Sequence, residues 1–538
     1  MLWSMKIINA NAKSYRLSKM TRRPMTQKAP VFTREATGLI RNVSLLDAVS
    51  INVSDMSAGA ALAVVGFTTI LLPTMSGVNL VYASIIAFVM LIPQIVIYTI
   101  MTQRVARTGG DYVWVSRSLG GFFGSVLALP GYTLGNLPYA SLIALSAVFA
   151  IGSVGVSLGN MSFLGLALPG NVSGANPTLQ FAVASAILII LVAINIVRPK
   201  FAYKLISIFT IIGILSVVLA IITLLSAGNS GVVNYMNTLN SSGANATYTS
   251  VANSYTGPTF DWGATAALLP FFALFVYPWV NAGPAVASEI KGKNSLKWNV
   301  PISAIVVMLL TTGAFASMYY VGGEAFINGA FANSNLVNNY SFNFWTLAMG
   351  VASTPIISWV IGIGWILWVI NILAYLVVIE GRYLMAQAFD RFLPSRVAYV
   401  SRYGSPIVAH LIDLIIILGL VAGASFLYGT FVSLYGTIVG PMIYFMFVGV
   451  AAVVHGVKRE TGRTKLILVT CGVLSAIVFF WLTSEFLLYP AIWGGNWLAY
   501  GFLVGSAVLG VVLYIGSKMY NARRGIDISL AFKQIPPE

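Results

Sequence analysis

Long apolar runs alternate with short polar segments along most of the 538-residue chain. Each run has the low charge and the length, about 20 residues, that a helix needs to cross the hydrocarbon core of a bilayer. The pattern therefore predicts an all-α, multi-pass membrane protein. Twelve membrane-spanning helices are expected, near residues 44–71, 79–103, 121–152, 178–197, 203–227, 263–288, 300–321, 353–379, 406–427, 431–455, 465–487 and 496–517.

Two of these helices contain residues that should interrupt them. In residues 271–291, Pro278, Gly283 and Pro284 fall within seven positions, and a proline removes a backbone donor and clashes with the preceding turn. In the first span, the small and polar segment 54–59 has the same effect. A proline kink without a ligand is the simplest alternative. Breaks at corresponding places in two halves, however, are typical of inverted repeats that hold a substrate between them.

The breaks define a candidate site for a small zwitterion. Amides at residues 54–59 would open a half-helix and suit a carboxylate, whereas carbonyls at residues 276–280 suit an amine or a cation. Asp55 is an acid at membrane depth, so its expected partner is a cation, a proton or a substrate amine. The alternative for Asp55 is a cap on the local break, and the alternative for the aromatic candidates is packing. The candidate substrate-binding residues at the breaks are Ser57, Ala58, Gly59, Val276, Tyr277, Trp279 and Asn281.

Positive charge occurs only between alternate spans and in the tails. All 30 Lys and Arg lie in the tails or in residues 104–117, 198–204, 291–297, 382–402 and 458–465. Cytoplasmic loops retain Lys and Arg, so both termini are expected to be cytoplasmic, in a protein of the plasma membrane. Glu289 is expected to pair with these basic groups and to help close an inner gate. Asp413 and His410, three residues apart in span nine, are expected to be buried together or to reach toward the interface.

The expected organisation has six parts. They are a cytoplasmic N-terminal tail (1–43), a first five-helix repeat (44–227), an extracellular polar loop (228–262), a second, inverted five-helix repeat (263–455), two further helices (456–517) and a cytoplasmic C-terminal tail (518–538).

Composition argues against enzymes, pumps and nucleic-acid binding. One cysteine and two histidines leave little for metal or haem chemistry. Residues 228–231 match a G-x-S-G protease pattern, but both histidines lie at the other ends of their spans and cannot serve Ser230 as a base. No G-x-x-x-x-G-K-[ST] motif is present for a nucleotide-driven pump. The net charge of +16 indicates topology first and contact with anionic lipid second. An ion channel is disfavoured, because one pair of breaks in a pseudo-symmetric monomer is not a repeated filter.

Four segments, in order between the right spans, resemble motifs of the amino acid-polyamine-organocation superfamily of permeases: residues 107–120, 195–200, 288–294 and 382–406. The resemblance extends from about Leu45 to Arg524. It implies a leucine-transporter-type fold, which is a five-plus-five inverted repeat with two further helices. It also implies amino acid transport by alternating access, with substrate bound between the two broken helices.

The resemblance adds residues to the site and shows departures. If span three lines the cavity as in relatives, Tyr132, Asn136 and Tyr139 face the substrate; interhelical hydrogen bonding is the alternative. Ser54, Asp55, Asn371 and Ser207 are the candidates for a coupling-ion site, for Na⁺ or H⁺. Two familiar proton-handling positions are neutral, at Gly213 and Asn281. Ala58-Gly59-Ala60 stands where the family often reads G-S/T-G.

The sequence therefore favours a secondary active amino acid transporter without a catalytic site, metal or cofactor other than a coupling ion. Neutral or aliphatic amino acids are the expected substrates. The alternatives are a polyamine or organic amine exchanger and a non-transporting amino acid sensor. Symport or exchange, the choice of Na⁺ or H⁺, and the oligomeric state stay open.

Overall fold

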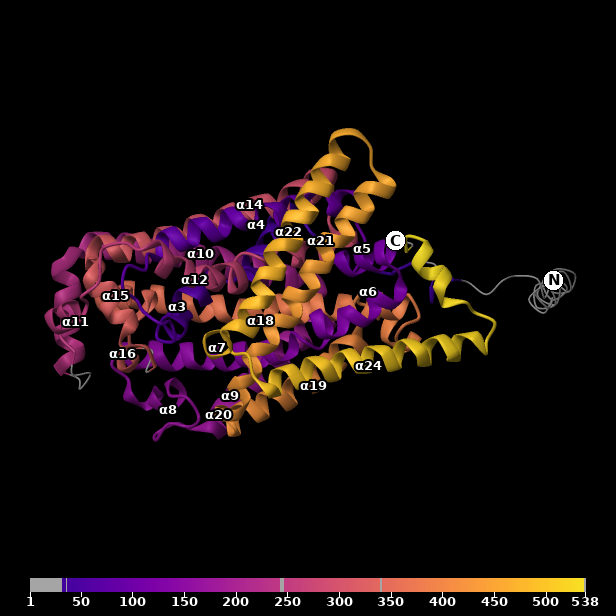
Figure 1. The fold of residues 1–538 in the computed structure, drawn as a ribbon. Helices are drawn as coiled ribbons and strands as arrows, with labels where there is room; N and C mark the ends of the chain where they lie inside the picture. The colour runs from indigo at the N-terminus through magenta and orange to yellow at the C-terminus, as the bar shows by residue number, and fades with distance from the viewer. Residues whose placement is uncertain (1–30, 35, 242–245, 339–340, 537–538) are drawn as a thin grey trace, which may run out of the picture.

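The computed structural model describes residues 31–536, apart from residues 35, 242–245 and 339–340. Residues 1–30 of the expected N-terminal tail lie outside this part of the chain. Most helices run roughly along one axis (Figure 1). Helices α11 (Tyr248–Ser254), α15 (Glu324–Ala332) and α16 (Ser334–Asn338) lie at one end, named the α11 end, and α5 (Gly110–Leu119) and the C-terminus lie at the other, named the α5 end.

Eleven segments of the described chain are long and apolar enough to cross a membrane. They are α2 with α3 (Leu45–Asp55, Ala58–Thr69), α4 (Leu80–Arg104), α6 with η2 and α7 (Gly121–Ala128, Leu129–Thr133, Leu137–Ser157), α9 (Pro177–Val197), α10 (Pro199–Leu239), α14 (Lys293–Gly322), α18 (Pro355–Phe389), α19 (Ile407–Phe426), α20 with η7 and α21 (Tyr428–Phe431, Val432–Ile438, Val439–Arg459), α22 (Gly462–Leu488) and α24 (Trp497–Ala522).

The sixth expected span is built differently. Helix α12 (Trp262–Phe275) is apolar but has only 14 residues, because the chain leaves the helix before Pro278. The remaining short elements are η3 (Met161–Phe163), α8 (Leu164–Ala167), α13 (Ala282–Ala285), η5 (Ala287–Glu289), α17 (Phe344–Gly350), η6 (Ser395–Ala398), α23 (Pro490–Trp493) and η8 (Ile528–Lys533).

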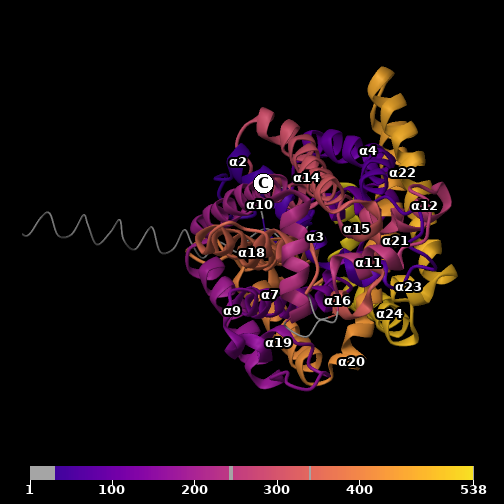
Figure 2. The ribbon, with the colours of Figure 1, turned by 90° about the vertical axis from the view of Figure 1, so that its left-hand side faces the viewer.

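The interrupted first span is the most enclosed of the eleven. Its most apolar window is 89% buried, compared with 28% for α22 and 22% for α24. Figure 2 looks onto the α11 end and shows α3 inside the bundle, with α9 and α19 toward one side and α22 and α24 toward another. The polar residues around Asp55 belong to this enclosed span. They are therefore surrounded by protein rather than by lipid.

Residues 228–262, expected as a polar loop, are largely helical. Helix α10 continues past Gly228, whose φ of 60° kinks the chain, and runs to Leu239. Helix α11 begins after Thr247, whose side chain accepts a hydrogen bond from the backbone N–H of Ser250. The Tyr248 hydroxyl then donates to the carbonyl of Gly322 at the end of α14 (2.9 Å). This segment forms a helical cover at the α11 end.

Basic segments from different helix junctions meet at the α5 end. Arg104, at the end of α4, pairs with Glu460 between α21 and α22 (3.0 Å). The backbone N–H of Lys291, before α14, donates to the carbonyl of Val43, before α2 (2.9 Å). The charge asymmetry of the sequence is therefore also an asymmetry between the two ends of the bundle.

Candidate functional site

The first span breaks between Asp55 and Ala58. Ser57 adopts the left-handed region with φ 54°, which costs a non-glycine residue about 1–3 kcal/mol and persists only where the surroundings require it. The Ser57 hydroxyl donates to the carbonyls of Ser54 (3.0 Å) and Asp55 (2.9 Å). These bonds satisfy carbonyls that the interrupted helix can no longer use.

The second break is attached to the first. Between α12 and α13 the backbone is irregular, and Gln94 of α4 donates to the carbonyl of Pro278 (2.9 Å). At the start of α13, the N–H groups of Ala282 and Gly283 donate to Asp55 Oδ2 (3.0 Å) and Asn52 Oδ1 (2.7 Å). Side chains of α2 therefore cap the helix that follows the second break.

A cavity of about 540 Å³ begins at the first break. It reaches the surface toward the α11 end, since its lining includes Leu71 and Val432, which are 50% and 41% exposed. Tyr139 lines this cavity, and its ring lies parallel to that of Trp279, with centroids 6.1 Å apart. The walls near the break are mostly apolar, as in sites for small organic molecules: Ser57, Ala60, Ala61, Tyr139, Phe275, Trp365, Val369 and Tyr435.

Asp55 and two asparagines present unpaired acceptors near the breaks. Asp55 is 1% exposed, and its Oδ1 has no hydrogen-bond partner within the described residues. The same holds for Oδ1 of Asn281 and Oδ1 of Asn371. Tyr375 and Tyr132 lie close to the Asp55 carboxyl. The Tyr132 hydroxyl is unpaired as well, and Tyr375 is near enough to donate to Asp55, so these tyrosines can supply donors to some of the acceptors. Because buried polar atoms are normally paired, the remaining acceptors suit an ammonium group, a metal cation or a proton.

Ser54 and Asn371 meet, but Ser207 does not join them. Asn371 Nδ2 donates to Ser54 Oγ (2.6 Å) and to Thr210 Oγ1 (2.8 Å). Ser207 instead donates to Asp47 Oδ1 (2.7 Å), one helical turn away from Thr210. The sequence reasoning missed Thr210, although its position three residues after Ser207 places both hydroxyls on one face of α10.

One of the other candidates of spans one and six lines the cavity, and the rest pack against or hydrogen bond to neighbouring segments. Gly59 packs so closely on Trp368 that a Cβ would lie 2.5 Å from the indole. The Tyr277 hydroxyl is hydrogen bonded to Ser84 of α4 (2.6 Å), and Trp279 Nε1 donates to the carbonyl of Leu274 (2.9 Å). Of the candidates at the breaks, Ser57 lines the cavity, whereas Ala58, Gly59, Val276, Tyr277, Trp279 and Asn281 are buried outside its lining.

The candidates of span three face α18. The rings of Tyr132 and Tyr383 lie 4.4 Å apart, and Asn136 Nδ2 donates to Glu380 Oε1 (3.0 Å). Tyr139, the third candidate of this span, lines the cavity, whereas Tyr132 and Asn136 do not. Glu380 was not predicted from the sequence, although it directly follows the expected eighth span. An acid at the end of an apolar run is a signal that could have found it.

Buried ion pairs close the α5 end. Arg382 Nε donates to Glu289 Oε1 (3.0 Å), and the Tyr203 hydroxyl donates to Glu289 Oε2 (2.9 Å). Arg117 Nη2 donates to Asp390 Oδ1 (2.6 Å). Glu289 therefore has a basic partner, from the residues that follow the eighth expected span.

A chain of hydrogen bonds links the α5 end to the second break. Asn281 Nδ2 donates to the Tyr383 hydroxyl (3.1 Å), which donates to Asp111 Oδ1 (2.6 Å). The Tyr98 hydroxyl donates to Asp111 Oδ2 (2.6 Å). Burial raises the pKa of the Asp111 carboxyl to about 6. Asp111 lies in the residue 107–120 motif, but its role had not been predicted.

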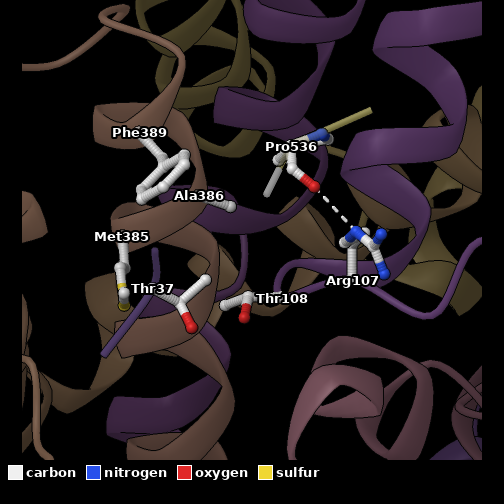
Figure 3. A pocket seen from close by; sticks show the side chains of 7 residues that line it. All are labelled: Thr37, Arg107, Thr108, Met385, Ala386, Phe389 and Pro536. Carbon is white, nitrogen blue, oxygen red and sulfur yellow. Dashed lines mark hydrogen bonds between the residues drawn. The ribbon is translucent and has the colours of Figure 1, made fainter. Parts of the chain in front are cut away.

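Both ends of the described chain pack onto this closed end. Thr33 Oγ1 donates to the carbonyl of Ala388 (2.8 Å), and Arg107 Nε donates to the carbonyl of Pro536 (2.7 Å). Figure 3 shows the small pocket where the N-terminal segment, the loop before α5, the end of α18 and the C-terminal segment meet. Its lining is Thr37, Arg107, Thr108, Met385, Ala386, Phe389 and Pro536.

Comparison with known proteins identifies a family for this chain. A family model described as amino acid permease matches residues 43–518, which is most of the chain. No curated protein matches the chain.

Proposed function

Because the chain belongs to the amino acid permease family of the amino acid-polyamine-organocation superfamily, we propose that it is a secondary active transporter of amino acids in the plasma membrane. Twelve membrane segments, counting the broken α12–α13 segment as one, would form a five-plus-five inverted repeat with two further helices. The observation that carries this proposal is the cavity that ends at Ser57, beside two helix breaks with unpaired buried acceptors.

In this proposal the two charged ends of an amino acid bind at the breaks. The first amides of α3, at Ala58 and Gly59, open a twelve-residue helix and suit the carboxylate. The unpaired Oδ1 of Asp55 suits the ammonium group or a coupling ion. The apolar walls favour a neutral or aliphatic side chain.

The difference between the two ends of the bundle supports alternating access in this proposal. The cavity is open toward the α11 end, and the pair Glu289–Arg382 is buried in the α5 end. If the α5 end is cytoplasmic, as its Lys and Arg indicate, the conformation faces outward. Release into the cell then requires the α5 end to open and its ion pairs to separate.

The coupling ion in this proposal binds near Asp55. The cluster of Ser54, Thr210 and Asn371 satisfies its own donors and leaves Asn371 Oδ1 unpaired, so this oxygen is the ligand that the cluster offers most readily. A proton needs no further ligands, whereas Na⁺ prefers several oxygens. The first experiment therefore varies both the Na⁺ concentration and the pH.

The first experiment is a thermal-shift screen of the purified protein against amino acids and polyamines, with and without Na⁺, at two pH values. Ligand that binds the folded state raises the melting temperature by mass action. A shift with neutral amino acids supports the proposal and names the substrate for uptake into liposomes. The variant Ala61→Trp, which fills the cavity, should lose the shift. Its control Leu215→Trp, at a 62% exposed position of α10, should keep it.

Two other outcomes redirect the assignment. A rise in the melting temperature with amines that lack a carboxylate would favour an amine exchanger. The unpaired oxygen of Asp55 is the observation that supports this alternative. Binding without accumulation in liposomes would favour a sensor.

A further inference from the structure

A second group of buried acids lies apart from the cavity, between α7, α18 and α19. Glu380 of α18 is 1% exposed and Asp413 of α19 is 5% exposed, and the two carboxyls are close enough to interact electrostatically. Beside them, α19 presses onto α18, since a Cβ on Gly381 would lie 2.6 Å from Cε1 of His410. Neither acid has an ion-pair partner among the salt bridges of the described chain.

This group contains more hydrogen-bond acceptors than donors. Asn136 Nδ2 donates to Glu380 Oε1 (3.0 Å). Glu380 Oε2, Asn136 Oδ1 and Asp413 Oδ2 are buried and have no partner in the part of the chain that the structure describes. The unpaired donors nearby are the Tyr132 hydroxyl and one ring N–H of His410, which are fewer than the three unpaired acceptors. Unpaired buried acceptors are unfavourable, and two neighbouring carboxylates in a low dielectric cannot both stay ionised. One proton on Glu380 or Asp413 removes a negative charge and supplies a donor to a neighbouring oxygen.

The other charged and titratable groups nearby do not neutralise the pair. Arg382, on α18 itself, is engaged by Glu289 and Tyr203. From the surrounding helices, Asp55 of α2 lies near Glu380, Tyr132 of η2 lies near it too, and His410 shares the Asp413 face of α19. Asp111 of α5 is bonded to Tyr383 rather than to Glu380. Asp55 therefore adds negative charge to the surroundings of the pair, and the nearby cation Arg382 is already neutralised by Glu289.

We propose that Glu380 and Asp413 form a proton-binding site, with Asn136 as its positioning residue, that couples transport to the pH gradient. This inference rests on the proposed transport function. Electrostatic contact between Glu380 and Asp55 connects the proton to the helix breaks. Binding or loss of the proton on the pair changes the electrostatic cost of a charge at Asp55, so proton and substrate binding become linked.

Protonation can be tested without a substrate. Infrared spectra of the purified protein at pH 7 should contain the carbonyl band of a buried protonated carboxylic acid, and Glu380→Gln should weaken or remove it. Glu460→Gln is the matched control, because Glu460 already pairs with Arg104, and it should leave the band unchanged. If Glu380→Gln folds poorly, Asp413→Asn should change the same band. A wild-type protein without the band overturns the proposal.

Coupling is tested in proteoliposomes with a labelled mixture of neutral amino acids. If one proton accompanies each substrate, an inward gradient of about one pH unit supports accumulation of up to about tenfold. Glu380→Gln should exchange the same amino acids but show no accumulation in response to the gradient. Stimulation by a Na⁺ gradient alone, or full response of Glu380→Gln to pH, overturns the coupling role. A wild type with the band but without transport of any amino acid refutes the transport function and leaves the proton site in place.

Discussion

Asp55, the last residue of α2, accepts a hydrogen bond from the backbone N–H of Ala282, the first residue of α13. One carboxylate oxygen thus joins the two interrupted spans, and the other has no partner within the described residues. The two readings of Asp55 from the sequence, a cap and a cation site, are therefore compatible. Each would use a different oxygen.

Asp55→Asn separates these two roles. The amide oxygen can still accept from Ala282, so the melting temperature should change little. The negative charge is lost, and a hydrogen bond to a charged group is typically stronger by about 1–2 kcal/mol than a neutral one. Gradient-driven accumulation should therefore fall by about tenfold or more. Exchange is retained if this oxygen binds the coupling ion, and it falls as well if the oxygen binds the substrate ammonium group. Uptake into proteoliposomes with and without the gradient measures accumulation and exchange. If the gradient drives accumulation equally well in the variant and in the wild type, the assignment is contradicted.

Glu289→Gln should favour opening of the α5 end. Removing one partner of a buried ion pair leaves Arg382 without its counter-charge and costs about 3–5 kcal/mol in typical cases. Thr108, whose hydroxyl is hydrogen bonded to Ser288 (2.6 Å), reports on this region. In a Cys471→Ser background, Thr108→Cys should react faster with a membrane-impermeant thiol reagent when Glu289 is Gln. The pair Arg104–Glu460, which lies nearer the surface, provides the control: Glu460→Gln should leave the rate unchanged.

Gly213→Ala should destabilise the protein. A Cβ at this position would lie 2.4 Å from the indole of Trp368, and overpacking of this kind costs about 1–3 kcal/mol. Gly419→Ala is the matched control on α19, because a Cβ there meets nothing within 4 Å. The melting temperature should fall for the first variant and stay level or rise for the second. Equal melting temperatures would mean that α10 and α18 are less tightly packed than the structure indicates.

Closure of the α5 end should depend on pH through Asp111. Its pKa is about 6 in the closed arrangement and 3.8 for an exposed carboxyl, so the closed state binds the proton more tightly. The resulting preference for closure is fully present below about pH 4 and is lost as the pH rises through 6. The difference between the two pKa values corresponds to about 3 kcal/mol. Labelling of Thr108→Cys should therefore speed up from pH 5 to pH 7, after correction for the reactivity of the thiol. Asp111→Asn should remove this dependence, and a pH profile that survives in Asp111→Asn would assign the effect to another group.

The sequence located the breaks because their causes are local. Pro278 and Gly283 disrupt a helix whatever surrounds them, and the small polar residues near Ser57 give a similar signal. The polar contacts that define the rest of the site are not local. Asn371 and Ser54 are separated by 317 positions, and Asn136 and Glu380 by 244. Ser207 and Thr210 lie one turn apart, so only the rotation of α10 against α2 decides which hydroxyl meets Ser54. Glu380 directly follows the expected eighth span and stands two residues before Arg382. Its position alone therefore indicates the end of a span rather than a partner for Asn136 or Asp413.

The packing of both chain ends on the α5 end has a consequence for control of the protein. The segments around Thr33 and Pro536 rest on the end of α18 and on the loop before α5, where the exit to the cell would form. On the proposed transport function, binding, modification or removal of these segments would change how easily that exit opens without touching the cavity. The tails would then set the rate of turnover and leave the choice of substrate the same.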